Sequence, residues 1–245
     1  MNSWIRSARG WQGFSLSFGL IALVWGFFLI KWGYKGSFLK LNALYTPWLD
    51  EVMPHFTHLG DGLIITGIFL VFFGRKNLAL VWAGLVSMVA LPLLMTLLKG
   101  YIFRGWDRPP RVFGNEVAFR YLTVAGEQHM SFPSGHSAAA FTLLTLAAFQ
   151  VKTMWQGALL AILAAAIAWS RLYIGVHFLG DILAGAALGY ALATACALGV
   201  YGPVKHRYEQ KGKVFSPKTE WIIAGLGVVL GLIQFVALFQ KYYQP

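Results

Sequence analysis

The sequence predicts an all-α protein that crosses the membrane as a polytopic helix bundle. Of its 245 residues, 58% are hydrophobic and 12% are charged, whereas an ordinary soluble domain has about 25% charged residues. The hydrophobic residues also form repeated stretches of about 20, the length of a helix that spans a bilayer. We therefore expect residues 1–245 to form a single integral membrane domain.

Apolar segments separated by polar residues define the expected helices. The first segment begins too late and runs too long for a secretory signal, and it lacks a clear small-residue cleavage site, so we expect it to be retained as a helix. The single cysteine, Cys196, excludes an intrachain disulfide. The expected helices cover residues 13–33, 57–74, 78–98, 134–150, 154–173, 178–201 and 219–240.

Longer connections cover residues 34–56, 99–133 and 202–218, and the last of these is polar and strongly basic. In the first connection, apolar residues recur at near-helical spacing around Asp50 and Glu51, which is typical of a short amphipathic helix in the membrane interface. Pro54 would interrupt that helix, so an ordinary loop is an equally good interpretation. The apolar residues of the pattern are Trp48, Leu49, Val52, Met53 and Phe56.

The net charge is +11, but the basic residues are scattered between the apolar segments, which argues against a nucleic acid partner. Lys and Arg in short loops resist translocation. With a cytoplasmic N terminus, Lys99, Arg108 and Arg171 face outward, and the basic residues divide evenly between the two sides, so charge alone leaves the orientation open. The residues that would face inward are Arg6, Arg9, Arg75, Lys76, Lys152, Lys205, Arg207, Lys211, Lys213 and Lys218.

The string SRLYIGVHFLGD, residues 170–181, contains a histidine and an aspartate four positions apart. His177 and Asp181 therefore lie one above the other on a helix face, where Asp181 can hold one imidazole nitrogen while the other keeps a free lone pair. A nucleophilic histidine needs that lone pair, although such a pair taken alone is more often structural. Gly185 and Gly189 continue the same face, which predicts close helix packing.

The string FPSGHSAAAF, residues 132–141, begins a helix with Ser134, Gly135 and His136 in its first turn. The free NH groups and the positive dipole end of a helix start bind anions, and Gly135 lets a phosphate approach the backbone closely. A simple helix cap by Ser134 is the alternative. The two are compatible, because one side chain satisfies only some of the free donors.

The string KGYIFRGWDRPPR, residues 99–111, has Lys99 at the end of a helix and Arg108 before Pro109. By itself it predicts only a snorkelling lysine and ordinary loop arginines. With a cytoplasmic N terminus, however, all three strings lie on the same outer side of the membrane. That coincidence indicates a single phosphate-binding site.

Together, the strings from Lys99 to Asp181 resemble the signature of the type 2 phosphatidic acid phosphatase family, which includes bacterial phosphatidylglycerophosphatase B and undecaprenyl-pyrophosphate phosphatases. The family pattern is Lys, six residues, Arg-Pro; then Pro-Ser-Gly-His; then Ser-Arg, five residues, His, three residues, Asp. The second and third motifs match fully. In the first motif eight residues separate Lys99 from Arg108, so either the loop bulges or Arg104 takes the place of the lysine.

The resemblance implies a lipid phosphatase with a six-helix core, to which segment 219–240 adds a peripheral seventh helix. No metal or other cofactor is implied. His177 would be the nucleophile that forms a phosphohistidine, with Asp181 behind it, and His136 would be the acid. The residues that would hold the phosphate oxygens are Lys99, Arg108, Ser134, Gly135 and Arg171.

Several alternatives stay open at this point. A lipid phosphotransferase on the same scaffold would carry the same strings, whereas a membrane transporter would explain the intramembrane charges but not the strings. A vanadium haloperoxidase shares the motifs but is soluble. Phosphatidylglycerophosphate, undecaprenyl diphosphate, phosphatidate and lipid A phosphates all fit as substrates, and we favour an isoprenoid or glycerol lipid, met on the outer face of a bacterial inner membrane. The sequence gives no oligomeric state.

Overall fold

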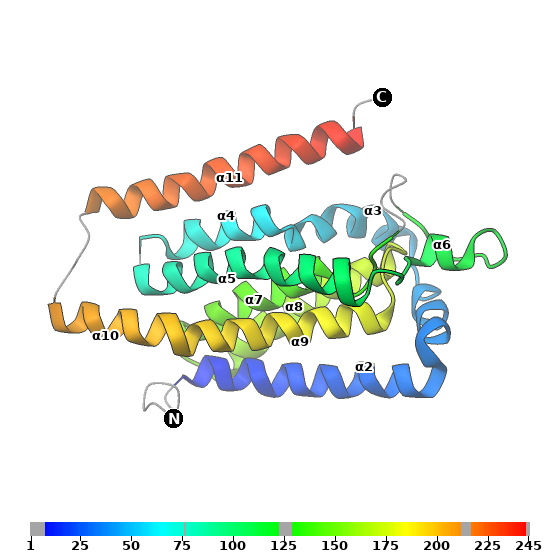
Figure 1. The fold of residues 1–245 in the computed structure, drawn as a ribbon, viewed down its shortest axis with the longest axis horizontal. Helices are drawn as coiled ribbons and strands as arrows, with labels where there is room; N and C mark the ends of the chain where they lie inside the picture. The colour runs from blue at the N-terminus through cyan, green and yellow to red at the C-terminus, as the bar shows by residue number, and fades with distance from the viewer. Residues whose placement is uncertain (1–7, 76, 123–128, 212–216, 244–245) are drawn as a thin grey trace.

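The computed structural model describes residues 8–75, 77–122, 129–211 and 217–243, and over these ranges the chain is a helix bundle without strands (Figure 1). The predicted all-α class is confirmed. The helices are α2 (Arg9–Asn42), α3 (Pro47–Phe56), α4 (Gly62–Phe73), α5 (Leu78–Leu97), α6 (Pro109–Phe113), α7 (Gly135–Ala148), α8 (Met154–Tyr173), α9 (Leu179–Cys196), α10 (Gly202–Lys211) and α11 (Pro217–Tyr243), with single turns η1 (Thr57–Gly60), η2 (Leu98–Ile102) and η3 (Ala197–Tyr201).

By length and composition, five helical segments of the described chain are able to cross a membrane, and a bent pair makes a sixth. The bent pair consists of Pro47–Gly60 and Gly62–Phe73, which meet at 70°. The expected segment 134–150 forms only the 14 residues of α7, which are fewer than the roughly 20 of a full span. The other spans are Arg9–Asn42, Leu78–Ile102, Met154–Tyr173, Leu179–Arg207 and Trp221–Leu238.

Helix α7 lies in the middle of the bundle, and glycines let its neighbours approach it closely. A Cβ atom on Gly189 of α9 would lie 2.2 Å from the carbonyl oxygen of Ala138 on α7, and one on Gly185 would lie 2.3 Å from that of Ser134. The packing predicted for the Gly185 and Gly189 face is therefore confirmed. Helices α2 and α8 meet in the same way, since a Cβ atom on Gly157 would lie 1.7 Å from the carbonyl oxygen of Gly10.

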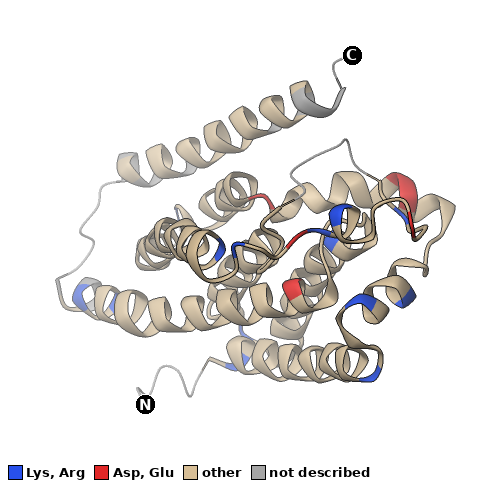
Figure 2. Ribbon diagram, turned by 45° about the vertical axis from the view of Figure 1, so that its right-hand side comes forward, with Lys and Arg blue, Asp and Glu red and all other residues tan. Residues whose placement is uncertain are grey.

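Polar contacts join three elements at the end of the bundle where α2 begins. The Asn77 side chain donates to Gln150 Oε1 (2.8 Å), and the Gln150 amide donates to the hydroxyl of Tyr201 (3.0 Å). These bonds tie the start of α5 to the end of α7 and to η3. The opposite end carries α3, α6 and the end of α11 (Figure 1), and Lys and Arg lie at both ends (Figure 2).

Three connections differ from their expected form. Helix α2 continues to Asn42 through a break at Gly33, whose φ of 68° suits glycine. The amphipathic helix expected in 34–56 forms as α3. Pro54 lies inside this helix without ending it, and the chain bends later, at Asp61. The basic segment 202–218 is helical to Lys211, since the π-helical turn η3 carries α9 directly into α10. Of the basic residues expected to face inward, Arg6, Lys76 and Lys213 lie outside the described residues.

Candidate active site

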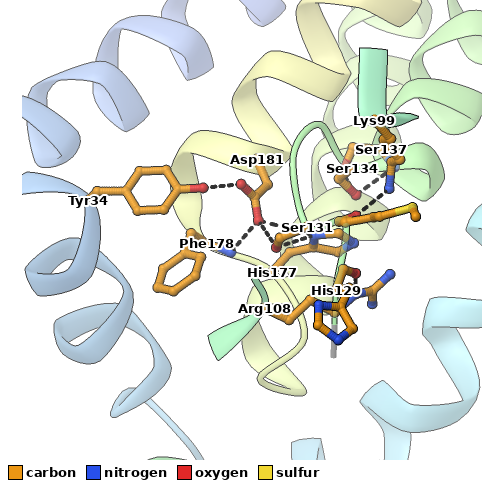
Figure 3. A network of polar contacts seen from close by, with 11 residues as sticks. Tyr34, Lys99, Arg108, His129, Ser131, Ser134, Ser137, His177, Phe178 and Asp181 are labelled. Atoms are coloured by element: carbon orange, nitrogen blue, oxygen red, sulfur yellow. Dashed lines mark hydrogen bonds and ion pairs between the residues drawn. The ribbon is translucent and has the colours of Figure 1, made fainter. Parts of the chain in front are cut away.

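The three sequence strings meet at the end of the bundle that carries α3 and α6 (Figure 3). The backbone joins two of them directly, because Ser134 NH at the start of α7 donates to the carbonyl oxygen of Asp181 on α9 (3.0 Å). The first string approaches from the other side. Lys99 Nζ donates to the carbonyl oxygen of Met130 at 2.8 Å, just before the start of the second string.

Asp181 is the most heavily bonded side chain of the site, and it is fully buried. Its Oδ2 atom accepts hydrogen bonds from Ser131 Oγ (2.5 Å), from the backbone NH of Phe178 (2.9 Å) and from His177 Nδ1 (3.1 Å). Its Oδ1 atom accepts one from the hydroxyl of Tyr34. The carboxylate is therefore satisfied on both oxygens, as a buried charge must be.

His177 lies in the turn between α8 and α9 and is 2% exposed. Because the carboxylate of Asp181 is an acceptor, Nδ1 carries the proton and Nε2 keeps its lone pair. Nδ1 also lies 3.3 Å from Ser131 Oγ. Burial, and then the positive charges of Arg108, Arg171 and Lys99, lower the pKa of His177 below its ordinary value, so the imidazole is neutral at pH 7.

Tyr34 and Ser131 complete this network, although the sequence analysis did not single them out. The break at Gly33 turns the chain so that Tyr34 reaches α9, and its ring lies against Gly180, where a Cβ atom would be 2.6 Å from Tyr34 Cε2. Ser131 is fixed through its backbone NH, which donates to the carbonyl oxygen of Trp106 (2.8 Å). Ser131 precedes the second string by one residue, whereas nothing in the local pattern connects Tyr34 with Asp181.

The first turn of α7 combines a helix cap with open space. Ser134 Oγ accepts from the backbone NH of Ser137 (3.4 Å) and from its hydroxyl (3.0 Å), so the predicted cap is present. A Cβ atom added to Gly135 would meet no described atom within 4 Å. The backbone beside Gly135 is thus open to a ligand at the positive end of the helix dipole.

His136 follows in the same turn, and its neighbours are mostly basic. Arg171 and Arg108 place positive charge near it, and His177 and His58 are its other titratable neighbours. The turn η1 packs against it directly, since a Cβ atom on Gly60 would lie 3.1 Å from His136 Cβ. The bend between η1 and α4 was not expected to form part of the site, and sequence spacing alone does not bring it there.

The three predicted cations each bond to a neighbouring segment. Arg108 Nε donates to the carbonyl oxygen of His129 (3.2 Å), and Arg171 NH1 donates to Thr57 Oγ1 of η1 (2.9 Å). Lys99, as noted above, holds the carbonyl of Met130. The charges of all three act on His177. The site therefore concentrates positive charge around a neutral histidine, an arrangement suited to a phosphate group.

The first string begins in a widened turn. Residues Leu98–Ile102 form the π-helical turn η2, which holds one more residue than an α-helical turn. Lys99 is part of this turn and lines the cavity next to His136, whereas the side chain of Arg104 is exposed to solvent. Of the two interpretations that the sequence left open, this geometry favours the bulge over Arg104.

An apolar groove leads away from the site. It encloses about 760 Å³. Its polar end is lined by Lys99, Gly135 and His136, and its apolar part lies between α4 and α5, with Gln234 of α11 also in its lining. The lining residues of the apolar part include Leu63, Leu85, Met88, Val89, Pro92 and Met95. A groove of this shape accommodates a lipid whose polar group lies at His136.

Similarity to known proteins agrees with this geometry. The PAP2 superfamily matches residues 80–204. The chain is 32% identical over 163 residues to phosphatidylglycerophosphatase B of Bacillus subtilis (strain 168). This match covers 60% of this chain and 72% of that protein. It is 38% identical over 101 residues to the Escherichia coli (strain K12) protein YbjG, which carries the name of an undecaprenyl-diphosphatase. This second match covers 41% of this chain and 48% of that protein.

Two crystal structures have a similar fold. One is LpxE of Aquifex aeolicus, with a TM-score of 0.58 and 27% sequence identity, covering 66% of this chain and 92% of that one. The other is a transmembrane PAP2 type phosphatidylglycerolphosphate phosphatase from Bacillus subtilis, with a TM-score of 0.51 and 26% identity, covering 82% of this chain and 98% of that one. The chain therefore belongs to the PAP2 superfamily and is an integral membrane lipid phosphatase.

Proposed function

We propose that this lipid phosphatase works through a phosphohistidine on His177. The observation that carries the proposal is the Nε2 lone pair of a buried, neutral imidazole whose Nδ1 proton is held by Asp181. In the first step Nε2 attacks phosphorus in line, so that a nitrogen–phosphorus bond forms and the bond from phosphorus to the lipid oxygen breaks. Asp181 stabilises the positive charge that develops on the imidazole.

Protonated His136 supplies the proton that the departing lipid oxygen needs, and the negative charge of the bound phosphate stabilises this protonated form. Its place at the start of the groove, beside the open backbone at Gly135, supports this role. In the second step His136 takes a proton from water, the water oxygen attacks phosphorus, and the nitrogen–phosphorus bond breaks to release free phosphate. A single residue thus acts first as acid and then as base.

The phosphate oxygens are held by charge and by backbone donors. Lys99, Arg108 and Arg171 supply the positive charges, and the backbone NH groups of Gly135 and His136 in the first turn of α7 supply hydrogen bonds, since the NH of Ser134 is already bonded to Asp181. Together these groups stabilise the transition state. These groups provide the stabilisation that a metal ion gives elsewhere, so the proposed mechanism requires no metal or other cofactor.

The substrate is an isoprenoid or glycerol lipid that carries a phosphate monoester or a diphosphate. The apolar groove between α4 and α5 supports a long-chain leaving group. The names of the relatives, a phosphatidylglycerophosphatase and an undecaprenyl-diphosphatase, support both lipid classes.

The site faces the outer, periplasmic side of a bacterial inner membrane, and the N terminus is cytoplasmic. The first residues of α2 lie at the opposite end of the bundle from the three strings (Figure 1). Arg9, Arg75 and Lys152 belong to that N-terminal end, as expected for basic residues that resist translocation.

Replacing His177 tests the proposed nucleophile. We expect His177→Ala to abolish phosphate release from a lipid phosphate and to abolish the covalent phosphate found after rapid quenching, because the substitution removes the nitrogen that attacks phosphorus. His206→Ala, on α10, is the control and should change neither. Undiminished phosphate release by a well-folded His177→Ala protein would refute the nucleophile, and transfer of phosphate to an added alcohol in place of water would favour a phosphotransferase.

The acid role of His136 predicts a dependence on the leaving group. A lipid alkoxide needs a proton to depart, whereas para-nitrophenolate does not. His136→Ala should therefore slow phosphohistidine formation from a lipid phosphate by about 10²-fold or more and slow formation from para-nitrophenyl phosphate much less. Rapid-quench measurement of both rates decides the question. Equal losses for the two substrates would contradict the role of His136 as acid.

The open backbone at Gly135 gives a variant that separates folding from activity. Because a Cβ atom there meets no described atom within 4 Å, Gly135→Ala should keep the unfolding temperature of the wild type. Its methyl group would nevertheless occupy the space proposed for phosphate, and kcat/KM should fall by about 10²-fold. Gly105→Ala, which is equally unobstructed, should change neither quantity. Full activity of Gly135→Ala would exclude phosphate from this position.

A further inference from the structure

Helix α11, which follows the segment matched by the family, packs along α4 by a close backbone contact. A Cβ atom on Gly67 of α4 would lie 2.6 Å from the carbonyl oxygen of Gly227 on α11, and one on Gly227 would lie 2.7 Å from Leu70 Cβ. This contact holds α11 against the helix that forms one side of the groove (Figure 1). Segment 219–240 is therefore packed against a groove-lining helix.

One side chain of α11 reaches the groove itself. Gln234 lines the cavity, and its Nε2 atom donates to Asp61 Oδ2 at 3.1 Å. A glutamine in an apolar helix is costly in a membrane unless its amide finds a partner. Asp61 is a rigid partner, because its Oδ1 atom caps α4 by accepting from the backbone NH groups of Leu63 (2.9 Å) and Ile64 (3.3 Å).

The pair of Asp61 and Gln234 lies near His136, the proposed acid of the reaction. Asp61 follows Gly60, whose backbone packs on His136, and both residues line the cavity together with Gln234. A lipid whose phosphate lies at His136 would therefore pass Asp61 and Gln234 with the atoms next to its phosphate ester. The rest of the lipid would continue between α4 and α5.

We propose that α11 is a wall of the substrate groove and that Gln234, fixed by Asp61, positions the lipid immediately beyond the phosphate that is cleaved. The inference rests on the proposed function, because it takes the groove as the lipid site. It assigns Gln234 a role in binding the lipid rather than in the chemical step. A water-soluble phosphate ester binds only at the polar end of the groove and has no chain that extends past this pair, so its hydrolysis should not depend on this pair.

Exchanging the carboxylate of Asp61 and the amide of Gln234 between the two positions tests the pair. In Gln234→Glu two carboxylates face each other, and we expect KM for a dioleoyl phosphatidate in detergent micelles to rise about fivefold, the effect of one lost hydrogen bond. The kcat/KM for para-nitrophenyl phosphate should not change. In the double variant Asp61→Asn/Gln234→Glu the new amide donates to the new carboxylate while its oxygen still caps α4, so the lipid KM should return to within about twofold of the wild type.

Two glycines of α11 provide a matched control for the wall itself. Gly227→Leu should separate α11 from α4 and raise the lipid KM, whereas Gly225→Leu, whose Cβ meets no described atom within 4 Å, should not. If Gln234→Glu impairs hydrolysis of both the phosphatidate and para-nitrophenyl phosphate, the comparison of the lipid KM in Gly227→Leu and Gly225→Leu decides whether α11 is a wall of the groove. An unchanged or lowered lipid KM in Gln234→Glu, or equal KM values for the two glycine variants, would overturn the inference. A wild-type protein that releases no phosphate from either substrate would instead contradict the proposed function.

Discussion

The buried carboxylate of Asp181 is the constraint on which the rest of the site depends. Removing a carboxylate from water costs several kcal/mol unless hydrogen bonds replace the lost hydration, and Asp181 receives bonds from Tyr34, Ser131, His177 and the backbone of Phe178. Two of these donors, Tyr34 and Ser131, come from distant segments that the fold must bring to Asp181. The same bonds leave the carboxylate no freedom to move, so the His177 ring is held in one orientation.

The bundle brings these segments together by letting backbones approach closely. Gly185 lies against the carbonyl of Ser134, and the NH of Ser134 donates to the carbonyl of Asp181, so α9 and the start of α7 are held together at the site. Gly60 sets η1 against His136 in a similar way. The charges of the site thus come from mutually packed helix ends rather than from a mobile loop, which suits a reaction that depends on fixed positive charge around the phosphate.

Much of this was predictable because it is local in sequence. Continuous apolar stretches predicted where the helices lie, and a spacing of four residues predicted the contact between His177 and Asp181. Contacts between distant segments were not predictable: Tyr34 reaches Asp181 only because the chain breaks at Gly33, and η1 reaches His136 only because α4 begins after a sharp bend. The spacing of the first string left a bulge and Arg104 as alternatives, since a π-helical turn at Lys99 has no clear signature in sequence.

The most direct test of the account is the rate of phosphohistidine formation in Asp181→Asn. The substitution keeps the shape of the side chain but removes the negative charge that stabilises the imidazole as it becomes positive. The account predicts a loss of about 10²-fold or more in that rate, measured by rapid quenching, with binding of the lipid retained. A wild-type rate in a folded Asp181→Asn protein would contradict it.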